Sequence, residues 1–193
     1  ASMGSPEDVR FVGAEGDAYD LSDVSPDLHG RVAHAFAALG IDKVKILSGY
    51  RSSVTNALAH GAKQSEHLEG NALDISAAGM KIGDRIELIK ALSAAGVTGI
   101  GVYANTIHAD LGGRRAWGPD HHFETVPKWA SNVIAEHLNG TVPPPRSINT
   151  RYAGLPYDDL VSFRAKADQA ISSRESAAAK ASAVDKVRVR QAR

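Results

Sequence analysis

Two short stretches of the chain carry histidine and aspartate side chains at spacings that suit a metal centre. In residues 65–75, Gly70 separates His67 from Asp74, which favours a loop that turns into a strand with Asp74 inside it. In residues 107–111, the two-residue period of a strand puts His108 and Asp110 on one face. An aspartate within an apolar strand is costly to bury unless a cation or strong donors meet it. These positions are therefore candidates for binding a cation.

The residues available as ligands narrow the kind of metal site. The chain has no cysteine, which excludes disulfide scaffolds, cysteine-based zinc fingers, iron–sulfur clusters and cysteine nucleophiles. His67, Asp74 and His108 on neighbouring elements would make a set of three Zn²⁺ ligands with a fourth position open for water, as in catalytic zinc sites. In the pair His108 and Asp110 either member could bind the metal, and we favour the histidine.

The elements that must position these residues follow from hydrophobic periodicity and from the glycines and prolines that punctuate it. We predict helices over 25–40, 52–60, 83–95 and 127–138, and strands over 44–47, 71–76, 99–103 and 107–111, the last two joined by a tight turn at 104–106. Helices flanking a small, mainly antiparallel sheet predict an α+β domain over residues 7–145.

The two ends of the chain are interpreted separately. Residues 1–6 resemble a tag remnant with a disordered start. The Pro-rich stretch 141–146 predicts a stiff linker, and residues 146–193 are expected to form a linker with a basic helical extension. From Arg164 to Arg193 there are eight basic and three acidic residues, which a solvated helix face explains. We expect this extension either to self-associate or to continue into a longer chain.

Composition excludes several functional classes. The chain has 193 residues, 43% hydrophobic and 23% charged, and 22 basic residues balance 22 acidic ones. This balance argues against a general nucleic-acid binder, which normally carries a basic surplus. No window approaches the roughly 18 consecutive apolar residues of a membrane span. We therefore expect no nucleic-acid partner and no integral membrane segment.

Several blocks in order resemble the M15 zinc peptidases, in the branch with His-x-Asp as its last motif. These blocks are Ser48-Gly49-Tyr50-Arg51-Ser52, Ser65-x-His67-x-x-Gly70-x-Ala72-x-Asp74-Ile75, Gly99-x-Gly101-x-Tyr103, His108-x-Asp110 and Arg115-x-Trp117. The family includes D-alanyl-D-alanine carboxypeptidases, murein endopeptidases and phage endolysins, on a fold shared with the hedgehog signalling domain. The resemblance implies that His67, Asp74 and His108 bind zinc and that Arg51 lines the substrate site.

The chain departs from the family pattern at one catalytic position. Many members place a Glu or Asp three residues before the last ligand as general base, and here that residue is Asn105. Asp110 is then either the base or a partner that orients the ligands, with Glu66 and Glu69 in reserve as bases. Tyr50, Tyr103 and Trp117 are interpreted as core or pocket wall, and His121 and His122 as loop residues.

The resemblance implies zinc-dependent hydrolysis of amide bonds in peptidoglycan stem peptides or cross-links, by a carboxypeptidase or a D,D- or L,D-endopeptidase. Such a protein would act in the cell envelope, outside the cell or in the periplasm, or as a module of a bacteriophage virion. Because Asn105 cannot accept a proton, the alternative is a catalytically inactive module that binds metal or cell-wall peptide. A third, weaker alternative is a structural connector.

Overall fold

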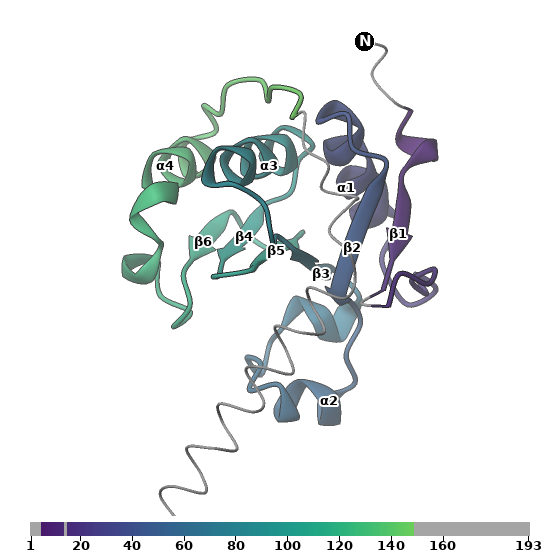
Figure 1. Ribbon diagram of the computed structural model, residues 1–193. Coiled ribbons are helices and arrows are strands. Elements are labelled where there is room, and N and C mark those ends of the chain that lie inside the picture. The colour runs from purple at the N-terminus through teal and green to yellow at the C-terminus, as the bar shows by residue number, and fades with distance from the viewer. Residues whose placement is uncertain (1–4, 14, 149–193) are drawn as a thin grey trace, which may run out of the picture. The chain divides into compact units, whose positions relative to one another are not determined.

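A computed structural model of the chain describes residues 5–13 and 15–148, which lie in the first of two units into which the chain divides, Ala1–Gly154. A sheet in the order β1-β2-β3-β5-β4-β6 runs through this unit (Figure 1). Its strands are β1 (Arg10–Val12), β2 (Lys43–Ser48), β3 (Ala72–Ser76), β4 (Gly99–Val102), β5 (Thr106–Asp110) and β6 (Arg115–Trp117). The three pairings from β2 to β4 are antiparallel, whereas β1 pairs with β2 and β6 with β4 in parallel.

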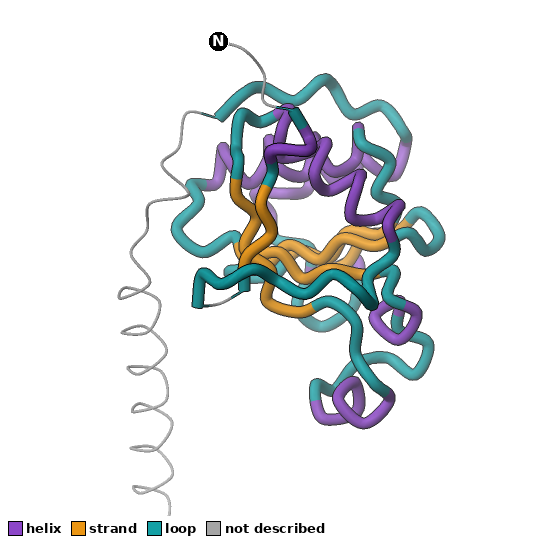
Figure 2. Tube along the Cα trace, turned by 90° about the vertical axis from the view of Figure 1, so that its right-hand side faces the viewer, coloured by secondary structure: helices purple, strands orange, loops and turns teal. Residues whose placement is uncertain are grey.

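Helices cover one face of this sheet. The helices are α1 (Pro26–Ala38), α2 (Ser53–Leu58), α3 (Ile82–Ala94) and α4 (Ser131–Asn139), with short 3-10 turns at Pro6–Asp8, Glu66–Glu69 (η2), Phe123–Thr125 and Lys128–Ala130. Helices α1, α3 and α4 lie together on one side, while α2 lies on the other (Figures 1 and 2). The α+β class predicted from the sequence is confirmed.

The alternation of side chains along the central strands separates the core from the site. Leu73 and Ile75 of β3 and Ile107 and Ala109 of β5 are fully buried among the apolar residues of the helices. The residues between them, Asp74 and His108, therefore point to the opposite face. In α1 the apolar residues recur at helical spacing, at Leu28, Val32 and Phe36, and all three are fully buried.

Some elements differ from the sequence predictions. The sequence predicts at most a short strand within 9–20, and β1 is such a strand. The stretch before Pro127 is predicted as a loop, yet β6 lies within it and extends the sheet at the edge opposite β1. The last predicted helix begins as a 3-10 turn, and its α-helical part is Ser131–Asn139.

The segment that follows α4 is bound to the folded unit. The backbone N–H of Ile148 donates to the carbonyl oxygen of Leu39 at 3.0 Å, and the Ile148 side chain is buried. The backbone and guanidinium of Arg146 bind the carboxylate of Glu87, which is buried in α3. Packing against the folded unit thus continues to Ile148, the last residue that the structure describes in this segment. The predicted helical extension lies outside the described residues.

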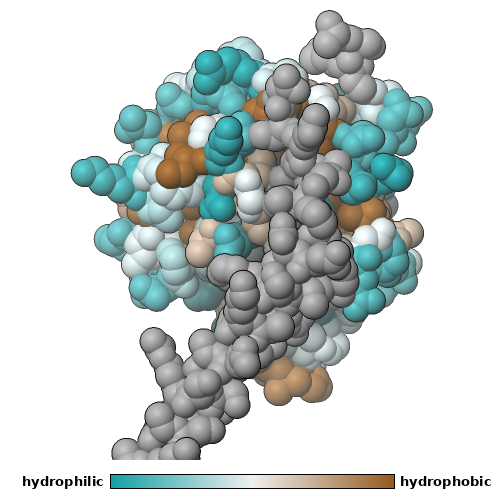
Figure 3. Space-filling model, viewed as in Figure 1, coloured by the Kyte–Doolittle hydropathy of each residue, from teal (hydrophilic) through white to brown (hydrophobic). Residues whose placement is uncertain are grey.

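Helix α2 exposes apolar side chains. Apolar surface appears where α2 lies (Figure 3), and the side chains of Val54 and Leu58 in this helix are 68% and 78% exposed. Among residues 5–13 and 15–148, no helix is long and apolar enough to cross a membrane.

Candidate metal centre and active site

The register of three strands gathers the polar residues of the site. In the pairing of β3 with β5, Asp74 stands opposite His108, and on the other side of β5 Gly101 of β4 stands opposite the same histidine. Asp110 stands between Ala72 and Gly99 in the next row. The small residues leave room on this face of the sheet for the imidazole and carboxylate groups that the neighbouring strand carries.

His67 joins this row from η2, just before β3. The side-chain oxygen of Ser65 accepts the backbone N–H of His67, and Gly70 ends the turn in the left-handed conformation with φ of 70°. A Cβ at position 70 would lie 2.1 Å from the carbonyl oxygen of Asp23, so a side chain would be excluded by space as well as by conformation. This glycine allows the chain to turn from His67 into the strand that carries Asp74.

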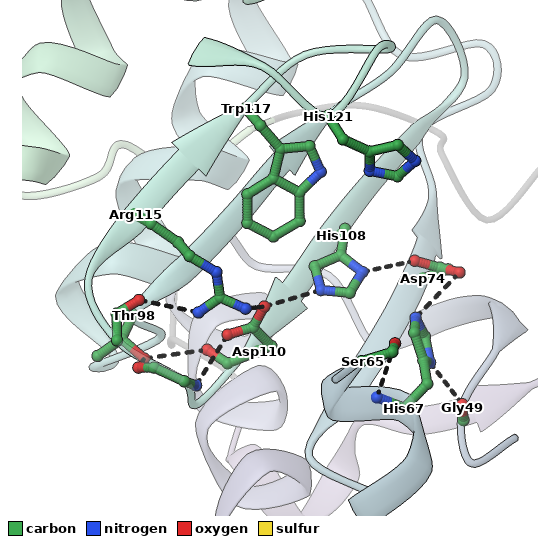
Figure 4. Close-up of polar contacts among 12 residues, drawn as sticks. Gly49, Ser65, His67, Asp74, Thr98, His108, Asp110, Arg115, Trp117 and His121 are labelled. Carbon is green, nitrogen blue, oxygen red and sulfur yellow. Dashed lines mark hydrogen bonds and ion pairs between the residues drawn. The ribbon is translucent and has the colours of Figure 1, made fainter. Parts of the chain in front are cut away.

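Three side chains converge at the centre of the site (Figure 4). One ligand atom from each of His67, Asp74 and His108 lies within 4.8 Å of the others. His67 Nε2 is 3.3 Å from Asp74 Oδ2, and His108 Nδ1 is 2.8 Å from Asp74 Oδ1. The structure therefore brings together all three residues predicted as metal ligands.

Each imidazole is held by its second nitrogen. His67 Nδ1 lies 2.5 Å from the carbonyl oxygen of Gly49, to which it donates. His108 Nε2 lies 2.9 Å from Asp110 Oδ2, to which it donates. The nitrogens that face Asp74 are thus His67 Nε2 and His108 Nδ1, and binding of a cation there would displace any proton that they carry. Hydrogen bonds of this kind behind the ligands fix ring orientation in metal sites.

Asp110 is fully buried behind His108. Its Oδ2 also accepts from the guanidinium of Arg115 at 2.9 Å, and its Oδ1 accepts from the backbone N–H of Gly112 at 2.8 Å. Burial would raise the pKa of Asp110, but the bond from His108 and those from Gly112 and Arg115 outweigh it and lower the pKa. Asp110 is therefore an ionised carboxylate whose oxygens already have partners.

Asp74 is bound on its other side by Arg51. The Arg51 guanidinium forms an ion pair with Oδ2 of Asp74, and its Nε donates to Ser48 Oγ at 2.7 Å. Burial would raise the pKa of Asp74, but hydrogen bonds from His108 and His67 lower it far below its ordinary value. The carboxylate is thus ionised and turned toward both rings.

The donor set fits a transition metal such as zinc. Burial would lower the pKa of His108, but its bonds with Asp110 and Asp74 outweigh burial and raise it. A proton between His108 Nδ1 and Asp74 therefore occupies the place that a shared cation would take, because metal binding displaces protons from its ligands. Two imidazole nitrogens and one carboxylate are the three protein ligands of many catalytic zinc sites.

The cluster lies in a cleft of about 600 Å³. Arg51, Glu66 and Asp110 line the cleft, as do Tyr103 and Trp117, so these predicted site and wall residues share it with the three predicted ligands. Tyr50, Asn105 and Glu69 are not among the lining residues.

The cleft also contains residues that we did not assign to it. His60, Arg115 and His121 line it. Arg115 belongs to the Arg-x-Trp motif, and the sequence predicts no role for it. His60 and His121 are the two non-glycine residues of the described chain with positive φ, a strain that no sequence pattern signals.

Comparison with known proteins agrees with this geometry. A family model described as peptidase M15 matches residues 14–110. The chain is 33% identical over 106 residues to a protein of Haemophilus influenzae named "Probable peptidoglycan L,D-endopeptidase MepK", covering 49% of this chain and 54% of that protein. It is 32% identical over 108 residues to "Peptidoglycan L,D-endopeptidase MepK" of Escherichia coli K12, covering 52% of this chain and 58% of that protein. The chain thus spans about half the length of these curated relatives.

The matched residues include His67, Asp74 and His108, which the strand register and η2 bring into one cluster. The chain therefore belongs to the peptidase M15 family.

Proposed function

We propose that this chain is a zinc-dependent endopeptidase that hydrolyses amide bonds in the peptides of peptidoglycan. The observation that carries the proposal is the cluster of His67, Asp74 and His108, with ligand atoms within 4.8 Å of one another in an accessible cleft. The names of two relatives, both peptidoglycan L,D-endopeptidases, support the substrate and favour internal cleavage over carboxypeptidase action. The place of action would be the cell envelope, or a phage virion that attacks it.

Zinc bound at this cluster would polarise the amide carbonyl and supply a nucleophilic water near neutral pH. The chain contributes the orientation of its ligands: Gly49 and Asp110 hold the two imidazoles, and Arg51 holds Asp74. Arg51 lines the cleft as well, so we propose that it also contacts a substrate carboxylate or carbonyl. For Asp110 the buried geometry favours the orienting role over that of the base.

The residue we propose as general base is Glu66. Three acidic residues line the cleft in the described part of the chain, namely Asp74, Asp110 and Glu66. The first is a proposed ligand, and the second is fully buried with its oxygens bonded. Glu66 is partly exposed, and residues 5–13 and 15–148 provide no hydrogen-bond partner for its carboxylate. It can therefore accept a proton from water at the cluster and pass it to the leaving amine.

The second candidate function is binding of metal or cell-wall peptide without catalysis. Asn105, which takes the place of the acidic residue of many family members, is exposed and lies outside the cleft lining. A module that binds metal or cell-wall peptide without cutting it is consistent with this substitution.

The test combines metal analysis with digestion. Purified wild type should hold close to one zinc per chain, and Asp74→Ala should lose this zinc. Asp8→Ala should retain it, because Asp8 is exposed and distant from Asp74 in the sequence. Zinc-loaded protein is then incubated with sacculi and defined muropeptides, and the fragments are identified by mass. New termini at an internal bond support the endopeptidase. Zinc without new termini favours the binding module, and absence of zinc from the wild type contradicts both.

Glu66→Gln should lower kcat by about 100-fold or more while zinc content is retained, because a general base contributes at least that factor. Glu69→Gln is the matched control, since Glu69 is exposed and does not line the cleft. Unchanged turnover in Glu66→Gln would place the base elsewhere.

A further inference from the structure

One wall of the cleft carries a chain of hydrogen bonds that ends on a histidine with no assigned role. Trp117 Nε1 lies 2.7 Å from the hydroxyl oxygen of Tyr103, and the same oxygen lies 3.3 Å from Nδ1 of His121. The Trp117 ring also packs on His108, with centroids 5.1 Å apart. In the close-up, Trp117 and His121 lie on the same side of His108 (Figure 4). The chain therefore connects the β6 edge of the sheet with the wall beside the proposed metal ligands.

The chemistry of the indole settles the direction of the first bond. An indole N–H can only donate, so the Tyr103 oxygen accepts from Trp117. Burial raises the pKa of Tyr103, so the hydroxyl keeps its proton at neutral pH. This proton is available to His121, and its donation to Nδ1 is one of the two directions that the 3.3 Å contact allows. It is the direction on which the inference below depends, and Nδ1 of His121 is then the acceptor.

This direction fixes the tautomer of His121. A neutral imidazole carries one proton, and when Nδ1 accepts a hydrogen bond that proton lies on Nε2. Within residues 5–13 and 15–148, no group forms a hydrogen bond with Nε2 of His121. The side chain is exposed and lines the cleft. It therefore offers the cleft an N–H donor that the protein itself does not use.

The backbone holds His121 in this place. The N–H of His121 donates to the carbonyl oxygen of Gly118 at 3.0 Å, and the N–H of Gly118 donates to the carbonyl oxygen of His122 at 2.9 Å. This tight turn requires φ of 59° at His121, a left-handed conformation that costs about 1 kcal/mol for a residue with a side chain. Unfavourable backbone conformations of this kind concentrate where a side chain must be aimed at a ligand.

We propose that Nε2–H of His121 donates a hydrogen bond to the carbonyl oxygen of the amide that is cut. This hydrogen bond becomes stronger as the oxygen gains negative charge in the transition state. The inference rests on the proposed peptidase function. It assigns His121 as a catalytic residue that stabilises the transition state, and Tyr103 as a positioning residue that acts through the tautomer of His121. No proton changes place in this step, because the donor keeps its proton throughout.

The test compares adjacent histidines. His121→Ala should lower kcat by about 100-fold, the factor lost with one donor to a developing oxyanion, and should change KM little. His121→Gln, which can place an amide N–H near the same point, should recover part of that loss. His122→Ala is the matched control, because His122 is also exposed but does not line the cleft. All variants should retain the zinc content of the wild type.

A second measurement needs neither metal nor turnover. Long-range ¹H–¹⁵N spectra of the metal-free protein should show His121 as the Nε2–H tautomer, and Tyr103→Phe should shift it toward a mixture of tautomers. A wild-type Nδ1–H tautomer, or a His121→Ala kcat within twofold of His122→Ala, would overturn the inference. If the wild type cuts no muropeptide, the proposed function fails and the inference fails with it. A wild type that cuts while His121→Ala keeps its kcat overturns the inference alone.

Discussion

Replacing Asp110 by asparagine should weaken zinc binding although none of the three proposed ligands is changed. The substitution keeps the size of the side chain and removes its negative charge. In the wild type the carboxylate accepts from His108, Arg115 and the backbone of Gly112, all at 2.8–2.9 Å. Asparagine has one acceptor oxygen and must turn its amide NH₂ toward at least one of these donors. His108 then loses either its ring orientation or the charge that favours a proton on Nε2.

The size of the effect follows from these contacts. Loss of a carboxylate behind a metal-bound histidine lowers metal affinity by about 10- to 100-fold, which corresponds to roughly 1.4–2.7 kcal/mol. The metal-free protein should lose about 1–3 kcal/mol of unfolding free energy as well, because a donor buried beside Asp110 is left without an acceptor. The two losses arise from the same contacts and should appear together.

Zinc affinity is measured by competition with a chromophoric chelator, and unfolding free energy by urea titration of the metal-free protein. Asp42→Asn is the control, because the Asp42 side chain is 67% exposed and, within the described part of the chain, forms only a long ion pair with Arg10 at 3.8 Å. Zinc affinity equal to that of the wild type would refute the orienting role. If turnover were lost at the same time, Asp110 would be the general base instead.

Three further predictions concern packing around the site and the end of the domain. Gly99→Ala should weaken zinc binding as Asp110→Asn does, because its Cβ would lie 2.1 Å from Asp110 Oδ1, whereas Gly113→Ala, with open space around it, should leave chelator titrations unchanged. Burial would raise the pKa of Glu87, but its bonds with Arg146 and Lys90 outweigh burial and lower the pKa below its ordinary value of 4.5. The ionised Glu87 therefore stabilises the fold above pH 4.5, and this stabilisation is lost as the pH falls through the lowered pKa of the folded state. Urea titrations from neutral to acid pH should therefore show a smaller loss of stability for Glu87→Gln than for the wild type, and equal losses would contradict this. Ile148→Ala should lower the unfolding free energy by about 2 kcal/mol, because the Ile148 side chain is buried. An unchanged unfolding free energy would support the predicted domain boundary at 145.

The elements that were predicted from the sequence share one property. The helices α1 and α3 and the strands β3, β4 and β5 bury an apolar face, so a local period of 3.6 or 2 identifies them. Strands β1 and β6 have three residues each, and their pairing is parallel to strands that are distant in the sequence or separated by another strand. Such short edge strands form because the neighbouring strand provides backbone hydrogen bonds, and no local sequence pattern indicates this tertiary pairing.

The same division applies to the site. The three proposed ligands stand in motifs with distinctive spacing, and the structure brings them together. The partners that orient them depend on tertiary contacts: Gly49 binds His67 through its carbonyl oxygen, which any residue type possesses. The burial of Glu87, an acidic residue of α3, also depends on a tertiary contact. It is explained by the bonds of its carboxylate with Arg146, which lies 59 positions later in the chain. His121 was assigned to a loop, which is its correct location, but its tautomer depends on Tyr103.

The register of β4 and β5 gives a physical reason for two motifs that look independent in the sequence. Gly101 pairs with His108 and Gly99 with Asp110, so the spacing of Gly-x-Gly equals that of His-x-Asp because both lie along neighbouring strands on one face. A Cβ at Gly99 would collide with the Asp110 carboxylate, and one at Gly101 would lie 2.8 Å from the Trp117 ring that packs on His108. The absence of side chains at Gly99 and Gly101 thus leaves the space that His108, the carboxylate of Asp110 and the ring of Trp117 occupy. A chain that kept His-x-Asp but carried a side chain at either glycine position would retain the proposed ligand His108 and lose the geometry that orients it.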